Sequence, residues 1–283
     1  RFEKTSYHKM VNTMKILKKF CLDEKVALVT GGSGLLGRKI CEGLLDVGAF
    51  VALIDVNLNE IEEWSAQLDI KKGQLSIFEC DVSSDRSVKL CVDAVVKTFG
   101  HIDILFNNAA TKTANLHDFF ESFEKYSIDV WRQVMSVNID GMFLMAQAVG
   151  PHMIKVGGGS IVQTSSIYGL SGPDNRIYKG SEYLGMEINS PAVYSASKAA
   201  VVGFTKWLAT YWASKEIRVN CLVPGGVSSG QNSVFSKAYS DRIPMGRMAF
   251  PSELIPLAIY LASDASTYVT GQVISVDGGL SAW

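Results

Sequence analysis

A tyrosine and a lysine four positions apart are the first residues in this 283-residue chain whose types and spacing suggest chemistry. Tyr194 and Lys198 lie within Ala192–Ala213, a stretch with helical spacing of apolar residues, so both side chains leave the same helix face. A tyrosine has an ordinary pKa of about 10, and a neighbouring ammonium group stabilises the phenolate and lowers that pKa. Such a pair can pass a proton to or from a substrate oxygen. The spacing alone is common on protein surfaces, so the interpretation depends on the motifs around it.

A glycine-rich segment provides the second indication of chemistry, and it lies between the apolar run Val26–Val29 and the helical pattern Leu35–Val47. Glycines at a strand-to-helix turn let a pyrophosphate approach the backbone, and the N–H groups of the helix N-terminus favour anions. The segment therefore predicts a dinucleotide site. Its expected members are Gly31, Ser33, Gly34, Leu35, Leu36 and Gly37. A nucleoside-triphosphate loop is set aside, because Arg38-Lys39 follows where Lys and then Ser or Thr would be required.

Asp55 follows the next apolar run, Phe50–Ile54, and adds information about the cofactor. A carboxylate at the end of the second strand hydrogen-bonds the adenosine ribose hydroxyls, and its charge repels a 2′-phosphate. No Arg or Lys stands at Val56 or Asn57 to bind such a phosphate. The sequence therefore favours NAD over NADP, with a helix-capping role for Asp55 as the alternative.

The elements that must position these residues alternate between strand-like and helix-like patterns. Seven apolar runs predict strands: Val26–Val29, Phe50–Ile54, Leu75–Cys80, Ile102–Phe106, Ser160–Thr164, Val219–Val223 and Val273–Val276. Helical spacing predicts helices between them: Leu35–Val47, Ile61–Leu68, Val88–Phe99, Val130–Val149, Ala192–Ala213 and Ser252–Leu261. Ser84 is a suitable N-cap before the third helix, and Gly100 ends it. Continuous apolar strands separated by helices indicate a parallel sheet covered on both faces, which is a single doubly wound α/β domain of the Rossmann type with seven strands.

Composition excludes several other functions. The 27 basic and 28 acidic side chains give a net charge of −1, which provides no electrostatic footprint for nucleic acid. No apolar run approaches the ~20 residues of a membrane span. The five scattered cysteines predict neither a disulfide framework nor a zinc site and favour the reducing cytoplasm, and the four histidines lack metal-ligand spacing, so we expect no metal. We expect residues 1–21 to form a flexible N-terminal extension, partly foreign to the natural chain, and residues 22–283 to form the domain.

Five motifs in one order resemble the short-chain dehydrogenase/reductase family. They are Thr30 to Gly37, Asn107-Asn108-Ala109-Ala110, Ser165-Ser166, Tyr194-x-x-x-Lys198 and Pro224-Gly225, and the similarity extends over about residues 22 to 283. The resemblance implies that Tyr194 is the general acid/base, that Lys198 lowers its pKa and holds the nicotinamide ribose, and that Ser166 donates to the substrate oxygen. It also implies that Asn138 supports a proton-relay water near the lysine.

The same resemblance assigns further residues to the cofactor. Asp81 and the following Val82 resemble the adenine-binding turn, and Asn108, Ala109 and Ala110 would lie along the cofactor after the fourth strand. Pro224, Gly225, Val227 and Ser229 would line the nicotinamide end, with Ser229 in place of the usual threonine. Single-residue alternatives remain for Ser166 as a strand cap, Asn138 as a helix polar residue and Asp81 as a turn former.

The chain departs from the family pattern in two places. Leu35 occupies the position of the second glycine, so the glycine spacing resembles the extended branch that modifies sugar nucleotides. Ser166 and Tyr194 are 28 positions apart, more than is usual, and the insertion at 172–190 connects two catalytic segments. We expect this insertion to lie over the active-site mouth, where Arg176 or Lys179 would meet an anionic or hydroxyl-rich substrate. A solvated loop with incidental charges is the alternative.

Several functions remain open from the sequence. The leading prediction is an NAD(H)-dependent oxidoreductase that interconverts a secondary alcohol and a ketone on a polar, sugar-like substrate. The alternatives are an NAD-recycling sugar epimerase or dehydratase, a 3-oxoacyl or gluconate-type reductase, and a non-enzymatic nucleotide sensor. The insertion and the ending Val276-Asp277-Gly278-Gly279 resemble family members linked to bacterial flagellin or surface-sugar modification. The resemblance and the aromatic residues from Phe204 to Trp212 imply a homodimer or homotetramer, with internal packing as the alternative.

Overall fold

Seven parallel strands form one continuous sheet in the computed structural model, which describes residues 15–183 and 185–283. The sheet order is β3-β2-β1-β4-β5-β8-β9, and every neighbouring pair is parallel. The strands in that order are β3 (Leu75–Glu79), β2 (Phe50–Asp55), β1 (Val26–Thr30), β4 (Ile104–Asn107), β5 (Gly159–Thr164), β8 (Ile217–Pro224) and β9 (Val273–Val276). All seven predicted strands and the doubly wound architecture are confirmed, with ends shifted by up to two residues.

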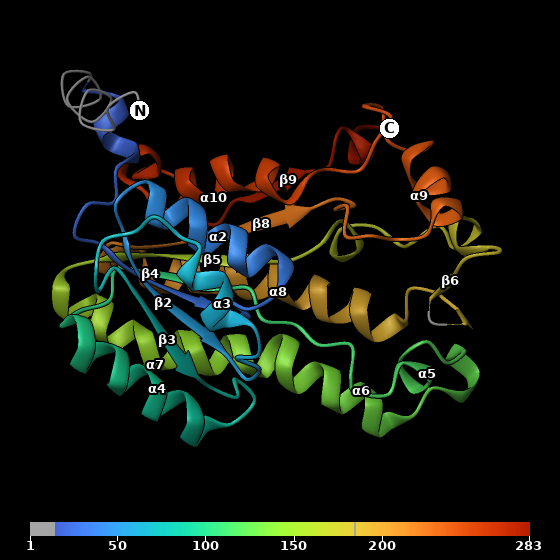
Figure 1. Ribbon diagram of the computed structural model, residues 1–283, viewed down its shortest axis with the longest axis horizontal. Coiled ribbons are helices and arrows are strands. Elements are labelled where there is room, and N and C mark those ends of the chain that lie inside the picture. The colour runs from blue at the N-terminus through green and yellow to red at the C-terminus, as the bar shows by residue number, and fades with distance from the viewer. Residues whose placement is uncertain (1–14, 184) are drawn as a thin grey trace.

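Helices cover both faces of this sheet (Figure 1). One hydrophobic core joins a sheet face to α4 (Asp85–Phe99), α7 (Gly141–Val156) and α8 (Ala192–Trp212). A second core joins the other face to α2 (Leu35–Asp46), α3 (Ile61–Ala66) and α10 (Ile255–Ala262). Both faces of the central strands are covered, so apolar runs such as Val26–Val29 and Phe50–Ile54 are buried without a strict alternation of apolar and polar residues.

Local signals set several helix ends as predicted. The hydroxyl of Ser84 accepts a hydrogen bond from the backbone N–H of Ser87 at 3.3 Å, which caps α4, and Gly100 ends that helix with φ +88°. The predicted helix Val130–Val149 differs in detail. It is divided into α6 (Ile128–Met135), a π-helical turn (Ser136–Asp140) and α7. A π-helical turn shifts the register of the side chains that follow it, and periodicity alone does not reveal it.

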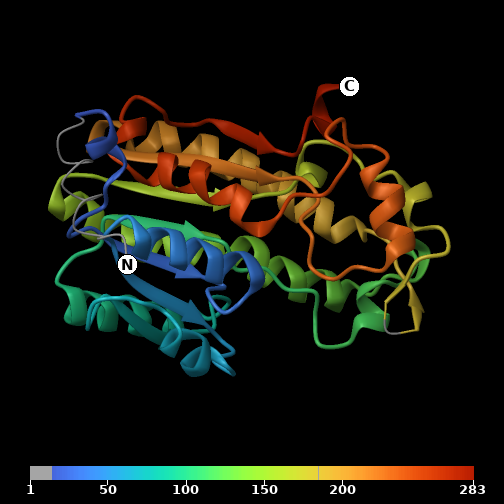
Figure 2. The same ribbon diagram turned by 45° about the horizontal axis from the view of Figure 1, so that its top comes forward.

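The insertion is more structured than the predicted loop. It contains a 3₁₀ turn (Asn175–Tyr178) and a two-stranded hairpin of β6 (Glu182–Tyr183) and β7 (Met186–Glu187). Two further helices that the sequence analysis did not predict, α5 (Leu116–Phe119) and α9 (Ser233–Ser240), gather with this hairpin at the end of the molecule toward which the strands point (Figure 2). The insertion thus lies at the carboxyl edge of the sheet, where ligands bind in doubly wound folds.

The predicted N-terminal extension, residues 1–21, lies largely outside the described residues. In its described part, Leu17–Phe20 form a 3₁₀ turn, and the Phe20 ring contacts that of Tyr260 with centroids 6.3 Å apart. No helix in the described ranges is both long and apolar enough to cross a membrane. Within the same ranges, no cluster of His, Cys, Asp and Glu side chains is arranged to hold a metal ion.

Candidate active site

The glycine-rich turn between β1 and α2 is packed so closely that side chains would not fit at several of its glycines. Gly31 has φ +63°, and a Cβ there would lie 2.8 Å from the Cα of Ala109. A Cβ at Gly37 would lie 2.0 Å from the carbonyl oxygen of Gly31. By contrast, Leu35 begins α2 with a half-exposed side chain, and Gly34 has an ordinary extended backbone. The turn therefore forms a tight backbone cradle even though leucine replaces the second family glycine.

Hydrogen bonds tie this cradle to the end of β4. The hydroxyl of Thr30 accepts from the backbone N–H groups of Asn108 at 3.0 Å and Ala109 at 3.1 Å. The Asn108 amide donates in return to the carbonyl oxygen of Thr30 at 3.2 Å. Asn108 and Ala109 therefore lie against the glycine turn, and Ala110 follows them exposed at the surface. Their predicted place along the cofactor stays a prediction.

The two acidic residues predicted to bind the adenosine lie at the carboxyl ends of adjacent strands. Asp55, at the end of β2, accepts hydrogen bonds from the backbone N–H of Ser33 at 3.0 Å and from its hydroxyl at 2.6 Å. Asp81, just after β3, is exposed and accepts from the N–H and hydroxyl of Ser83. Val82 is buried beside Gly141 at the start of α7, where a Cβ would lie 2.8 Å from the valine methyl group. The carboxylates are thus held by local bonds at the edge of the cradle.

Tyr194 and Ser166 line one cavity of about 370 Å³. Burial raises the pKa of the Tyr194 phenol above its ordinary value, and a hydrogen bond with the Ser166 hydroxyl partly offsets that rise. Ser166 stands at the end of β5 and also caps the next turn, because its hydroxyl accepts from the N–H of Tyr168 at 3.2 Å. The predicted donor and the predicted acid/base are therefore direct neighbours.

Lys198 is buried one helical turn from Tyr194, and its Nζ donates to the carbonyl oxygen of Thr164 at 2.9 Å. Burial lowers the pKa of this lysine to about 8. The expected lowering of the tyrosine pKa by this ammonium group is not found in this structure. Burial is the largest influence on the phenol, and Ser166 is the group that opposes it. The difference arises because the ammonium group is directed to the end of β5.

Asn138 connects the loop after β4 to the catalytic helix. It is fully buried on the π-helical turn, where its side-chain oxygen accepts from the Thr111 N–H at 3.0 Å. Its amide nitrogen donates to the Ser197 hydroxyl at 3.1 Å, which in turn donates to the backbone carbonyl of Tyr194 at 2.9 Å. The side chain is thus fully engaged in fixing the helix segment that carries the tyrosine.

Some of the remaining predicted residues line the cavity and others do not. Gly225, Val227 and Ser229 line it, and Pro224 ends β8 directly before them. Arg176 and Lys179 are not among its lining residues. The Arg176 guanidinium is bound by the carboxylate of Asp174 at 2.8 Å and is almost fully exposed, so the structure does not bring this predicted substrate contact to the cavity.

Comparison with known proteins identifies the family. Residues 33–281 match a family model described as enoyl-(acyl carrier protein) reductase. D-threitol dehydrogenase of Mycolicibacterium smegmatis is 35% identical over 265 residues, which cover 92% of this chain and 94% of that protein. A short-chain dehydrogenase structure from Leptospira borgpetersenii serovar Hardjo-bovis with bound NAD+ has a TM-score of 0.80 and 34% identity, covering 93% of this chain and 95% of that one. This chain belongs to the short-chain dehydrogenase/reductase family.

A second solved member of the family extends the comparison. A gluconate 5-dehydrogenase from Burkholderia cenocepacia, in complex with NADP and tartrate, has a TM-score of 0.80 and 31% identity, covering 94% of this chain and 98% of that one. The chain is therefore an NAD(P)-dependent oxidoreductase of the short-chain type. Its glycine cradle fits a dinucleotide, because the close backbone packing at Gly31 and Gly37, where a Cβ would collide with Ala109 and Gly31, forms the tight strand-to-helix turn at which a pyrophosphate approaches the helix N-terminus.

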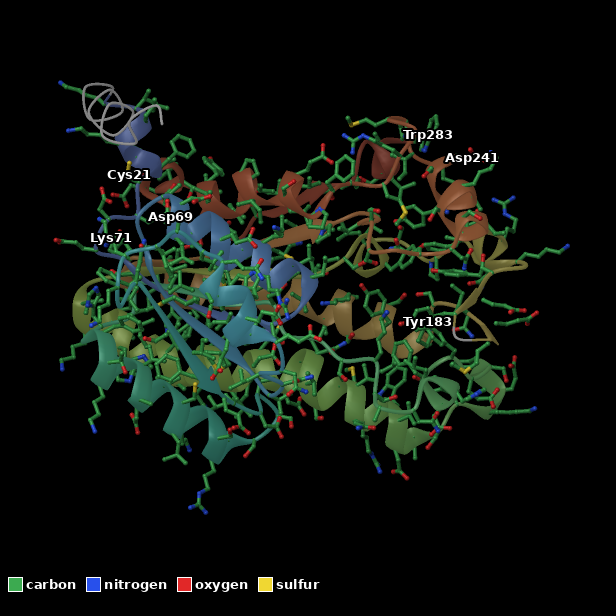
Figure 3. All side chains as sticks on the ribbon, in the orientation of Figure 1. Cys21, Asp69, Lys71, Tyr183, Asp241 and Trp283 are labelled. Atoms are coloured by element: carbon green, nitrogen blue, oxygen red, sulfur yellow. The ribbon has the colours of Figure 1, made fainter. Side chains whose placement is uncertain are left out.

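The sequence analysis missed the aromatic wall of this short-chain dehydrogenase. Tyr168, Tyr178, Phe235 and Tyr239 all line the cavity, and Tyr183 of the hairpin, labelled in Figure 3, lines its outer part. The i,i+4 spacing of Phe235 and Tyr239, after the capping residue Asn232, was a usable helix signal. Nothing in the sequence showed that Tyr178 would pack against them, because that contact joins distant segments.

Proposed function

We propose that this chain is an NAD(H)-dependent dehydrogenase that interconverts a secondary alcohol and a ketone on a polar, sugar-like substrate. The observation that carries the proposal is that Ser166 and Tyr194 line the same cavity at the carboxyl edge of the sheet, where the serine hydroxyl lowers the pKa of the buried phenol. Relatives named for D-threitol and gluconate support the class of substrate. The cavity volume of about 370 Å³ lies in the range of small-molecule sites.

In the proposed mechanism, NAD, when bound, supplies the hydride acceptor and its reduced form the donor. Ser166 donates a hydrogen bond to the substrate oxygen and stabilises the charge that develops there. Tyr194 accepts the hydroxyl proton in oxidation and returns it in reduction. Lys198 would hold the cofactor ribose. Asn138 positions the tyrosine through Ser197.

Asp55 supports NAD rather than NADP as the cofactor. Its carboxylate is fixed at the end of β2 by Ser33, and a 2′-phosphate placed there would meet a like charge. The guanidinium of Arg38, just after the glycine turn, already donates to the Ser33 carbonyl and lies over the Trp64 ring. In Asp55→Asn, which keeps the hydrogen-bond acceptor, we expect the ratio of kcat/KM for NAD over NADP to fall at least about tenfold. An unchanged ratio would remove Asp55 from cofactor selection.

Two further parts of the proposal concern the whole chain. We propose a homodimer or homotetramer, which is supported by Trp207 and Tyr211, two exposed aromatic residues of α8. We also propose the cytoplasm as its location, which is supported by five cysteines that are all unpaired, four of them buried.

The direct test is a panel of polyols, sugars and hydroxy acids with NAD, followed by the absorbance of NADH. Net accumulation of NADH supports the dehydrogenase, whereas conversion of substrate without NADH supports the NAD-recycling epimerase suggested by the glycine spacing. Tyr194→Phe should lower kcat by about 10²- to 10⁴-fold and leave NADH binding unchanged. Tyr268→Phe, a fully exposed tyrosine that does not line the cavity, is the matched control. Full activity of Tyr194→Phe would refute the assigned role.

A further inference from the structure

The aromatic wall of the cavity is a single packed unit built from two distant segments. The Tyr178 ring from the insertion stacks on Phe235 of α9, with ring centroids 5.5 Å apart and an angle of 25° between the planes. Phe235 in turn contacts Tyr239 with centroids 5.5 Å apart. Aromatic faces carry negative partial charge and attract the polarised C–H face of a ring. This wall therefore suits one face of a compact carbon ring.

The phenols of this wall carry no charge at neutral pH. Burial raises the pKa values of Tyr168, Tyr178 and Tyr239 above their ordinary value. The Tyr178 and Tyr168 hydroxyl oxygens lie 3.4 Å apart and serve as neutral hydrogen-bonding groups. An anionic group that enters the cavity therefore meets no negative charge from these side chains.

Lys112 is the only charged side chain among the residues that line the cavity in the described ranges. Its backbone is held in place, because the preceding Thr111 N–H donates to the buried Asn138 side chain at 3.0 Å. No ion pair or hydrogen bond engages the Lys112 ammonium group among the described residues. Two other cations at this end of the molecule are paired, Arg176 with Asp174 and Lys237 with Asp241, and Lys179 of the insertion does not line the cavity.

These observations define a subsite within the proposed active site. We infer, on the basis of the proposed function, that the substrate is a ring sugar with one anionic group, a carboxylate or a phosphate ester, which pairs with Lys112. Its ring lies against Tyr178 and Phe235, while the reacting hydroxyl reaches Ser166 and Tyr194. Lys112 is thus a specificity-determining residue, and it replaces Arg176 and Lys179 as the cation that selects the substrate.

Three sugars that differ only at the sixth carbon test this inference: D-glucose 6-phosphate, D-glucuronate and D-glucose. Their binding to the protein saturated with NADH is measured by calorimetry, so the result does not depend on turnover. We expect at least one of the two anions to bind about tenfold or more tightly than glucose, and the stronger of them identifies phosphate or carboxylate as the preferred group. Equal affinities for all three, or no binding of any, would overturn the inference and leave the dehydrogenase test unaffected.

Two pairs of variants assign the effect to the named residues. Lys112→Gln should reduce the preference for the anions to within about threefold of glucose, whereas Lys179→Gln, an exposed lysine of the insertion, should leave it unchanged. Tyr178→Leu should weaken all three sugars by a similar factor, and Tyr178→Phe, which keeps the ring, should not. If Lys112→Gln leaves the preference intact, or weakens NADH binding instead, the subsite is refuted.

Discussion

In the proposed mechanism, the pair Ser166 and Tyr194 determines the pH range in which a proton can be removed from the substrate. Burial raises the phenol pKa and the serine hydroxyl lowers it, so the reactive form depends on their contact. In Ser166→Ala the lowering is lost. We expect kcat to fall by about 10²- to 10³-fold and the alkaline rise of the oxidation rate to move to higher pH. A pH profile of kcat with NAD measures both effects, and an unshifted profile would show that Ser166 does not act on the tyrosine.

The buried ammonium group of Lys198 makes the stability of the protein depend on pH. Its pKa is about 8 in the folded protein and is higher when the chain unfolds, so the unfolded state binds more protons between these values. Stability should therefore rise with pH through this window, by about 2 kcal/mol between about pH 7 and about pH 9.5. Denaturant unfolding of the cofactor-free protein measures the rise.

Two lysine variants isolate this effect from the other titrating groups. Lys198→Met should lack the rise, although loss of the bond to Thr164 also changes its absolute stability. Lys206→Met, which removes an exposed lysine of the same helix, should follow the unmodified protein. Parallel curves for all three proteins would mean that Lys198 is not buried as a cation.

At the scale of elements, the turn between β1 and α2 restricts most strongly which residue types it can contain. A methyl group at Gly37 would lie 2.0 Å from the Gly31 carbonyl oxygen, whereas one at Gly34 would lie 3.4 Å from it, an ordinary contact. Gly37→Ala should therefore displace the cradle and weaken NADH binding at least about 100-fold, while Gly34→Ala should bind within about threefold of the unmodified protein. Fluorescence titration with NADH compares them. A similar loss of NADH affinity in both variants would show that the cradle is sensitive to any added side chain, and not specifically to the contact between Gly37 and Gly31.

Elements that are marked by residues close together in the sequence were predictable, and elements that depend on distant contacts were not. Strands such as Phe50–Asp55 are buried on both faces and therefore appear as short apolar runs in the sequence. Ser84 marks the start of α4 through its side-chain hydroxyl, and Gly100 marks the end through its backbone conformation. The π-helical turn at Ser136–Asp140 carries no such signal. The hairpin of β6 and β7 has two residues per strand, too few for any periodicity, and its place is set by contacts with α9 such as the bond from Asn232 to Glu182 at 2.8 Å.

The candidate site shows the same division between local and distant signals. Tyr194, Lys198 and Ser166 could be found because each sits in a short motif, and the fold brings them to one edge of the sheet. The orientation of the Lys198 ammonium group toward Thr164 could not be found, because it depends on how α8 packs against β5. Lys112 has no motif at all and becomes notable only as the charged residue of the cavity wall.

At the scale of the whole molecule, an aromatic patch runs along α7 and α8, outside the active site. The Phe143 ring on α7 contacts that of Phe204 on α8 with centroids 6.4 Å apart, and Trp207 stacks on Tyr211 with centroids 4.8 Å apart. Trp207 and Tyr211 are 57% and 62% exposed, more than internal packing would leave. Large exposed aromatic patches on soluble proteins mark interaction surfaces, and aromatic residues dominate the binding energy of such interfaces. The patch therefore supports self-association through these two helices.

A charge placed in this patch tests whether it holds the subunits together. In Trp207→Glu an unpaired carboxylate would have to lose its water in the interface, and we expect the dissociation constant of the oligomer to rise at least about 100-fold. Sedimentation velocity over a range of protein concentrations measures the change. Phe123→Glu, an exposed aromatic residue away from these helices, should assemble like the unmodified protein. Because Tyr194 lies on the same helix α8, kcat measured at concentrations where the variant is dissociated shows whether the interface also supports the proposed active site. A monomeric unmodified protein, or an equally assembled Trp207→Glu, would show that the patch serves another purpose.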